Sequence, residues 1–142
     1  MAGGASALGF TYPVNRGGMA AAKSHIGKVK ITDIKTATIN IKYPAHLVKI
    51  ETDSGLFGLG EAVPRKDQRP GESRDMTGDI RNLMQYLQGQ DPLQYGVLYE
   101  EMMRGDIRLG SWAGIKPGLI SGVETAMLDL AGKILGVPVY TL

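Results

Sequence analysis

The sequence contains no cysteine and only two histidines among its 142 residues. The lack of cysteine excludes a disulfide framework, a zinc–thiolate site and a cysteine nucleophile. Two histidines leave little material for an imidazole metal cluster. A chain without cysteine is compatible with a reducing compartment, so we expect a cytoplasmic protein.

A strong charge of one sign and a long apolar run are also missing. Sixteen basic and fourteen acidic residues give a formal net charge of +2, and no basic stripe with interleaved aromatics marks a nucleic-acid interface. No apolar run approaches the roughly 20 residues that span a bilayer. Pro13, Asn15 and several glycines interrupt every candidate signal-peptide core in the first 27 residues. The sequence therefore predicts neither a nucleic-acid partner nor a membrane partner.

Length and composition are those of one globular domain. Apolar residues make up 43% of the chain and charged residues 21%, close to the average for soluble domains. Residues 1–27 are rich in glycine and alanine and lack apolar periodicity, which predicts a flexible arm. Residues 28–142 are predicted to form the folded domain.

The first half of this domain has the alternation of β-strands. One slip near Asp33 indicates a bulge, Pro44 interrupts the pattern, and the turn residues Asp53-Ser54-Gly55 separate the last two segments. Three segments show β-branched or alternating apolar residues: 29–41, 46–52 and 56–61. They predict a three-stranded antiparallel meander.

The second half changes to helical spacing. Apolar residues predict helices over 76–87, 91–102 and 117–134. Asp91 is expected to cap the second helix, whose apolar stripe comprises Leu93, Val97, Leu98 and Met102. Asp129 and Lys133 lie one turn apart on the third and predict a surface ion pair. Strands followed by helices define the fold class: α+β, with a three-stranded antiparallel β-meander followed by a bundle of about three helices.

Glycines and carboxylates offer no complete site. The run Gly55-Leu56-Phe57-Gly58-Leu59-Gly60 lies in a predicted hairpin rather than between a strand and a helix, so it favours a turn and close backbone contact over a phosphate loop. A hard cation needs several converging oxygens, and none of the nearby acidic pairs supplies them: Asp75 and Asp79, Glu100 and Glu101, Glu124 and Asp129.

A few single side chains remain as candidates. His46 begins the second strand and is either a histidine at the surface or hydrogen-bonded within the strand, or a ligand contact. The loop 62–72 carries Arg65, Lys66 and Arg69, which could bind a carboxylate bidentately or could simply be solvated. Trp112, the single tryptophan, fits core packing, burial at an interface or substrate stacking.

Two ordered groups of residues resemble a known family. Residues 30–34 and 47–61, followed by 121–133 and 136–140, are similar to the opening meander and last cap helix of the mandelate racemase and muconate-lactonising branch of the enolase superfamily. The resemblance covers about 115 residues, 28–142. The short link through Tyr43 and Pro44 is most similar to sugar-acid dehydratases of the galactonate type.

The resemblance implies an enolase-type N-terminal cap domain. In such enzymes a C-terminal β/α barrel, which we expect this chain to lack, carries the catalytic residues and the carboxylates that bind Mg²⁺. The implied activity is a dehydratase, or else a racemase or cycloisomerase, acting on a sugar acid or another carboxylate. This chain alone is then expected to be inactive and to bind no metal. The cap would contribute Tyr43, His46 and Arg65 as substrate contacts, and the complete enzyme is expected to be a homo-oligomer.

A second hypothesis is a stand-alone α+β module that binds another protein without catalysis. The two hypotheses differ in the surface that they predict. A cap separated from its barrel should expose apolar side chains that evolved to be covered, whereas a self-standing module should hide them.

Overall fold

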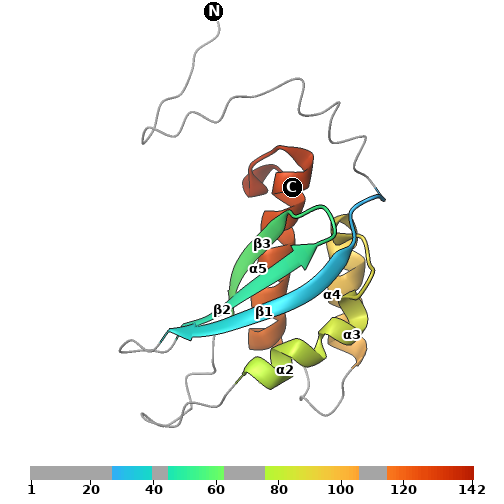
Figure 1. Ribbon diagram of the computed structural model, residues 1–142. Helices are drawn as coiled ribbons and strands as arrows, with labels where there is room; N and C mark the ends of the chain where they lie inside the picture. The colour runs from blue at the N-terminus through green and yellow to red at the C-terminus, as the bar shows by residue number, and fades with distance from the viewer. Residues whose placement is uncertain (1–26, 40–44, 63–75, 106–114) are drawn as a thin grey trace, which may run out of the picture.

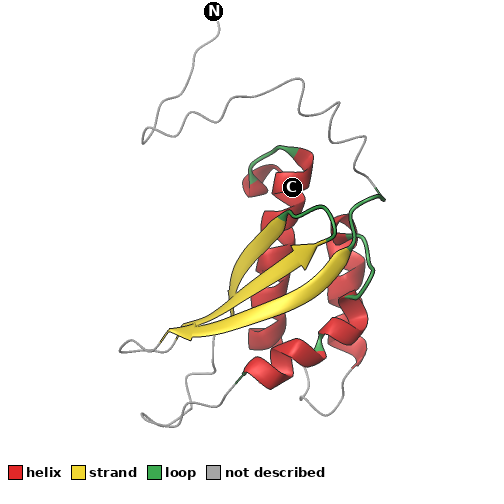
Figure 2. Ribbon diagram, in the orientation of Figure 1, coloured by secondary structure: helices red, strands yellow, loops and turns green. Residues whose placement is uncertain are grey.

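The computed structural model describes residues 27–39, 45–62, 76–105 and 115–142. A three-stranded sheet lies on a layer of helices (Figures 1 and 2). The elements in chain order are β1 (Ile31–Ile39), β2 (Ala45–Thr52), β3 (Phe57–Ala62), α2 (Thr77–Asn82), α3 (Met84–Leu87), the 3₁₀ turn η1 (Pro92–Gln94), α4 (Tyr95–Gly105), α5 (Ile115–Leu135) and the 3₁₀ turn η3 (Val139–Thr141). The predicted α+β fold class is confirmed.

The sheet is an antiparallel meander in the order β1-β2-β3. Ile34 pairs with Ile50, and Val48 pairs with Gly60. The register shifts between Ile31 and Asp33, which confirms the predicted bulge. Because successive side chains point to opposite faces of a strand, the buried residues Ile34, Val48 and Ile50 face the helices.

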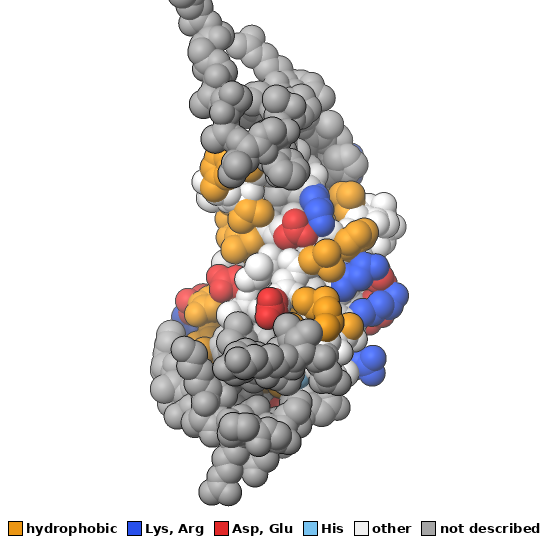
Figure 3. All heavy atoms as spheres, turned by 90° about the vertical axis from the view of Figure 1, so that its left-hand side faces the viewer, with side chains coloured by type: hydrophobic (Ala, Val, Ile, Leu, Met, Phe, Trp, Pro, Cys, Tyr) orange, Lys and Arg blue, Asp and Glu red, His pale blue; other side chains and the backbone are white. Residues whose placement is uncertain are grey.

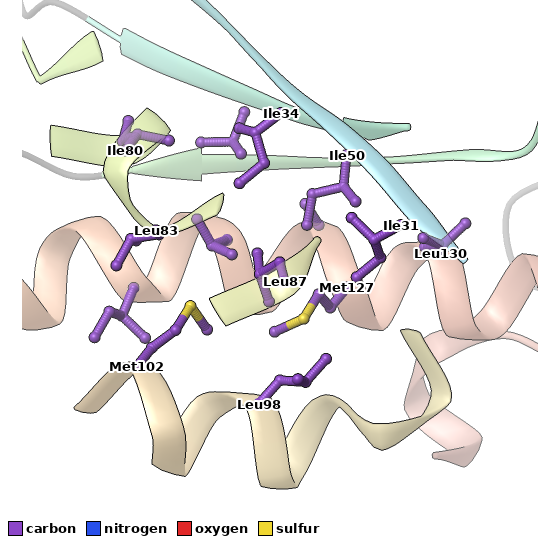
Figure 4. Packing of buried hydrophobic residues seen from close by; sticks show 14 of the residues in the cluster. Ile31, Ile34, Ile50, Ile80, Leu83, Leu87, Leu98, Met102, Met127 and Leu130 are labelled. Carbon is purple, nitrogen blue, oxygen red and sulfur yellow. The ribbon is translucent and has the colours of Figure 1, made fainter. Parts of the chain in front are cut away.

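The hydrophobic core lies between the sheet and the helices, and α5 is its centre (Figure 4). Burial of these side chains supplies the main driving force of folding, at about 25 cal/mol per Å² of apolar surface. The residues that α5 contributes to the core cluster are Leu119, Ile120, Val123, Ala126, Met127, Leu130 and Ile134.

Glycines allow α5 to lie directly against β3. A Cβ atom added at Gly58 would overlap the carbonyl oxygen of Ala126, and one added at Gly60 would overlap that of Gly122. A Cβ at Gly122 would in turn lie 2.6 Å from the backbone nitrogen of Ala62. The strand glycines therefore serve close backbone contact, as predicted, while Gly55 adopts a positive φ of 80° in the turn.

Two details of the helices differ from prediction. The helix expected over 76–87 is interrupted at Leu83, between α2 and α3. Val97, predicted to lie on the apolar stripe of the second helix, is 57% exposed. The prediction for Val97 was wrong because the face of α4 that meets the core runs through Leu98 and Met102, with Tyr95, Tyr99 and Met103 packed beside them. Val97 lies about 100° around the helix from Leu98, away from this face.

The predicted N-cap is present. The Asp91 side chain accepts hydrogen bonds from Leu93 N at 2.9 Å and from Gly27 N at 3.0 Å. Pro92 occupies the first position of η1, where no backbone N–H is needed. Asp91 thus joins the start of the helical layer to the segment that leads into β1.

Candidate functional site

One end of the sheet gathers the ends of all three strands. β1 finishes there at Ile39, β2 begins at Ala45, and β3 finishes at Ala62, because an antiparallel meander reverses direction at each turn. The segments 40–44 and 63–75, which follow β1 and β3 at this end, include the link through Tyr43 and Pro44 and most of the predicted loop 62–72. Tyr43 and Arg65 belong to them and lie outside the described residues, so their roles stay predictions.

His46 is the predicted site residue that the structure describes. Its side chain is 3% exposed and lies on the helix-facing side of β2. Ring atom Nδ1 shares a hydrogen bond of 3.0 Å with the hydroxyl oxygen of Thr38, its neighbour across the sheet. His46 also pairs with Ala62 of β3. The ring is thus fixed between the strand ends from which both loops leave, and its contact with a ligand stays a prediction.

A cavity of about 580 Å³ opens between β1 and the helices α2 and α3. It is lined by Asp33, Ile34, Lys35, Thr36, Arg81 and Met84. Among buried side-chain polar atoms of the described residues, the Thr36 hydroxyl oxygen is the one without a hydrogen-bond partner. Sequence reasoning missed this cavity. Its one signal in the sequence was a polar threonine two residues after the core residue Ile34, at an inward position of β1.

The outer face of the sheet carries a network of opposite charges. Glu51 accepts from Lys35 at 2.6 Å and from Lys49 at 2.7 Å. The hydrogen bonds from Lys35 and Lys49 lower the pKa of the Glu51 carboxyl below its ordinary value of 4.5. The Glu51 carboxylate in turn raises the pKa of Lys35 above 10.5. Lys49 also lies 4.4 Å from the ring centroid of Phe57.

The predicted ion pair on α5 is present and also contacts the sheet. Lys133 Nζ lies 2.6 Å from Asp129 Oδ2. The same carboxylate oxygen accepts from Leu59 N at 2.8 Å, and Lys133 donates to the carbonyl oxygen of Phe57 at 2.9 Å. The pair therefore connects α5 to the outer edge of β3, which the spacing of two residues on one helix did not reveal.

No metal site is found in the part of the chain that the structure describes. No three histidine, aspartate or glutamate side chains gather there as ligands. Glu100 instead pairs with Arg104 one turn along α4, at 3.1 Å. Likewise, none of the described helices is both long and apolar enough to cross a membrane. The candidate Trp112 lies outside the described ranges.

Comparison with solved structures defines the class of this fold. The chain superposes on a mandelate racemase/muconate lactonizing enzyme-like protein from Rubrobacter xylanophilus with a TM-score of 0.67 and 38% identity, covering 79% of this chain and 27% of that one. The meander and its helical layer are thus an N-terminal domain of the enolase superfamily. A family profile described as "Mandelate racemase / muconate lactonizing enzyme, N-terminal domain" matches residues 22–142. The chain belongs to this family, which confirms the resemblance seen in the sequence.

The similar proteins of known activity include sugar-acid dehydratases. The chain is 37% identical over 113 residues to a D-xylonate dehydratase from Haloferax volcanii, covering 80% of this chain and 26% of the relative. It is 36% identical over 114 residues to a D-galactonate dehydratase from Ralstonia nicotianae, covering 80% and 28%. The chain spans about a quarter of the length of these relatives.

Proposed function

We propose that the chain is the capping and specificity domain of a Mg²⁺-dependent sugar-acid dehydratase. The reaction removes the proton next to the substrate carboxylate and then expels the β-hydroxyl as water. The observation that carries the proposal is the identity of 37% and 36% to D-xylonate and D-galactonate dehydratases over the folded domain. These relatives favour a dehydratase over a racemase or cycloisomerase.

The catalytic groups are proposed to lie in a β/α barrel of the complete enzyme. Within the described residues no acidic cluster could hold a divalent cation. Mg²⁺ bound in the barrel would supply positive charge for the carboxylate as the substrate loses its proton. The 142-residue chain alone is therefore proposed to be inactive.

This chain is proposed to cover the substrate and to select it. The end of the sheet that holds His46 also anchors the segments that contain Tyr43 and Arg65. A guanidinium such as that of Arg65 would recognise a carboxylate or several hydroxyls, and the His46 ring could hydrogen-bond a hydroxyl. Segments that close over a site also exclude water from it.

Exposed apolar residues support a covering domain over a self-standing module. Val139 and Leu142 are 44% and 41% exposed, and Tyr140 between them is 85% exposed. The outer side of the sheet adds exposed Leu47 and Leu59, while Figure 3 shows apolar and charged side chains interspersed on the face turned to the viewer. The consecutive residues 139–142 are the ones we propose to be covered by the barrel.

The test compares the 142-residue chain with the complete polypeptide that carries it. Each is assayed with D-xylonate and D-galactonate, with Mg²⁺ or EDTA, for the 2-keto-3-deoxy acid that dehydration yields. We expect turnover by the complete polypeptide with Mg²⁺ and none by the chain alone. Turnover by the chain alone, or isomerisation without loss of water by the complete polypeptide, would overturn the proposal.

The role of His46 has its own variant. His46→Asn retains a side chain that can bond to Thr38. In the complete polypeptide we expect it to raise KM about tenfold, which corresponds to about 1.4 kcal/mol of binding free energy. Arg104→Gln, on the exposed side of α4, is the control. Equal KM values for the two variants would remove His46 from the substrate site.

A further inference from the structure

The two edges of the sheet are closed to different extents. At β3, Asp129 accepts from Leu59 N and Lys133 donates to Phe57 O. Side chains of α5 therefore form hydrogen bonds with two backbone groups at this edge. At β1, Ile31 N donates to Gln90 O at 3.0 Å, and Ile31 O accepts from Gly89 N at 2.9 Å. Unpaired edge groups are the usual place for another strand to add, so the remaining open groups show where one could bind.

The open groups lie in the second half of β1. Ile34 N is bonded to the carboxylate of the adjacent Asp33 at 2.8 Å. Because N–H and C=O directions alternate along a strand, Thr36 and Thr38 also point these groups to the outer edge, while Lys35 and Ala37 point theirs to β2. Within the described ranges, no contact closes the edge at Thr36 or Thr38. About three residues of β1 are therefore available for pairing.

A groove runs beside this open edge. The cavity of about 580 Å³ has β1 on one side and Arg81 and Met84 of the helical layer on the other, and α2 and α3 lie along this side of β1 (Figure 1). The volume is in the range of ligand sites, about 300–1,000 Å³. Arg81 forms no ion pair within the described part of the chain, and the hydroxyl oxygen of Thr36 has no partner.

We infer that this groove binds an extended peptide segment, which adds to β1 as a fourth strand and carries an acidic side chain opposite Thr36. Strand addition beside a helix uses main-chain hydrogen bonds for affinity and alternate side chains for specificity. Side chains directly opposite each other on neighbouring strands have Cβ atoms about 4.5–5.5 Å apart. An inward carboxylate at that position accepts from the Thr36 hydroxyl and pairs with the Arg81 guanidinium.

A second copy of β1 does not fit this chemistry. The edge residues that antiparallel pairing of two β1 strands brings opposite Thr36 are Ile34, Thr36 or Thr38, and none of them carries the carboxylate that Arg81 lacks. In addition, Arg81 and Met84 bound the groove on the side away from β1. The partner is therefore a single acidic strand rather than the sheet of another copy.

The experiment titrates the ¹⁵N-labelled 142-residue chain with the peptide acetyl-Val-Thr-Glu-Thr-Val-amide and follows NMR shifts. In this peptide the valines and the glutamate point inward. We expect saturable shifts of the Thr36 and Thr38 amides and of Arg81 Nε, with binding in the millimolar range. The peptide with glutamine in place of glutamate should bind at least fivefold more weakly.

Further variants test the acidic side-chain contact and the main-chain pairing separately. Arg81→Gln should abolish the difference between the glutamate and glutamine peptides, while Arg104→Gln should preserve it. Thr38→Pro removes an edge N–H without removing a backbone bond to β2, and Thr38→Ala, which loses only the hydroxyl bonded to His46, is its control. Relative to Thr38→Ala, Thr38→Pro should weaken both peptides equally.

Equal binding of both peptides to the unmodified chain, or shifts confined to other surfaces, would overturn the inference. It would also fail if the Thr36 and Thr38 amides shifted with protein concentration alone and the peptide did not compete, because the occupant would then be a second copy.

Discussion

Gly60→Ala tests the close contact between β3 and α5. The new methyl group would overlap the carbonyl oxygen of Gly122 and lie 2.8 Å from the backbone nitrogen of Ala126. Both atoms belong to the main chain of α5, so no side-chain rotation can relieve the overlap. The helix and the strand must separate, and their separation opens the core around Met127 and Leu130.

The expected loss of stability is about 2 kcal/mol. Overpacking of a close contact costs about 1–3 kcal/mol, and a backbone contact belongs in the upper half of that range. Replacing glycine also restricts the unfolded chain, which offsets about 0.4–1 kcal/mol. An unfolding entropy of roughly 2.1 cal/mol/K per residue, taken over the roughly 115 residues of the folded domain, converts the net loss into a fall in Tm of about 8 °C.

Guanidinium denaturation followed by circular dichroism measures this change. Gly96→Ala is the matched control, because a Cβ at Gly96 on α4 meets nothing within 4 Å. That variant should leave stability unchanged or raise it by up to about 1 kcal/mol. If Gly60→Ala were as stable as Gly96→Ala, the steric account of the glycine contact would be refuted.

Three further variants test local interactions. Asp91→Ala deprives two backbone N–H groups of their acceptor and should cost about 1–2 kcal/mol in the same denaturation assay, so an unchanged midpoint would contradict its role as a cap. Hydrogen bonds from two lysines lower the pKa of Glu51, so its contribution to the free energy of unfolding is full above the unfolded-state pKa and is lost as pH falls through the lower folded pKa. Glu51→Gln should therefore flatten the acid limb of a profile of stability against pH, and an acid limb identical to that of the unmodified chain would contradict this. Asp129→Ala leaves Leu59 N without its acceptor and should cost about 1 kcal/mol, with faster amide hydrogen exchange at Leu59 as the specific readout.

The local features of the fold could be predicted because short-range chemistry determines them. The bulge near Asp33, the turn with positive φ at Gly55 and the cap at Asp91 each follow from a few neighbouring residues. The meander also follows from the alternation of β-branched residues, and its antiparallel pairing is confirmed.

The remaining features depend on residues far apart in the sequence. The contact of Asp129 with Leu59 spans 70 positions, so helical spacing alone could show only its partner on α5. The cavity beside β1 likewise needs the placement of α2 and α3. Of the three predicted substrate contacts, the structure describes His46 alone.

The odd number of strands has a consequence for how such domains diversify. The connection after β1 and the exit from β3 share one end of the sheet. Gly58, Gly60 and Gly122 instead allow the close contact between β3 and α5 along the length of the strand. Insertions or deletions in either connection can therefore change this end of the sheet without disturbing the backbone contact between β3 and α5. Changes in these connections and changes in the contact between β3 and α5 can then be selected separately.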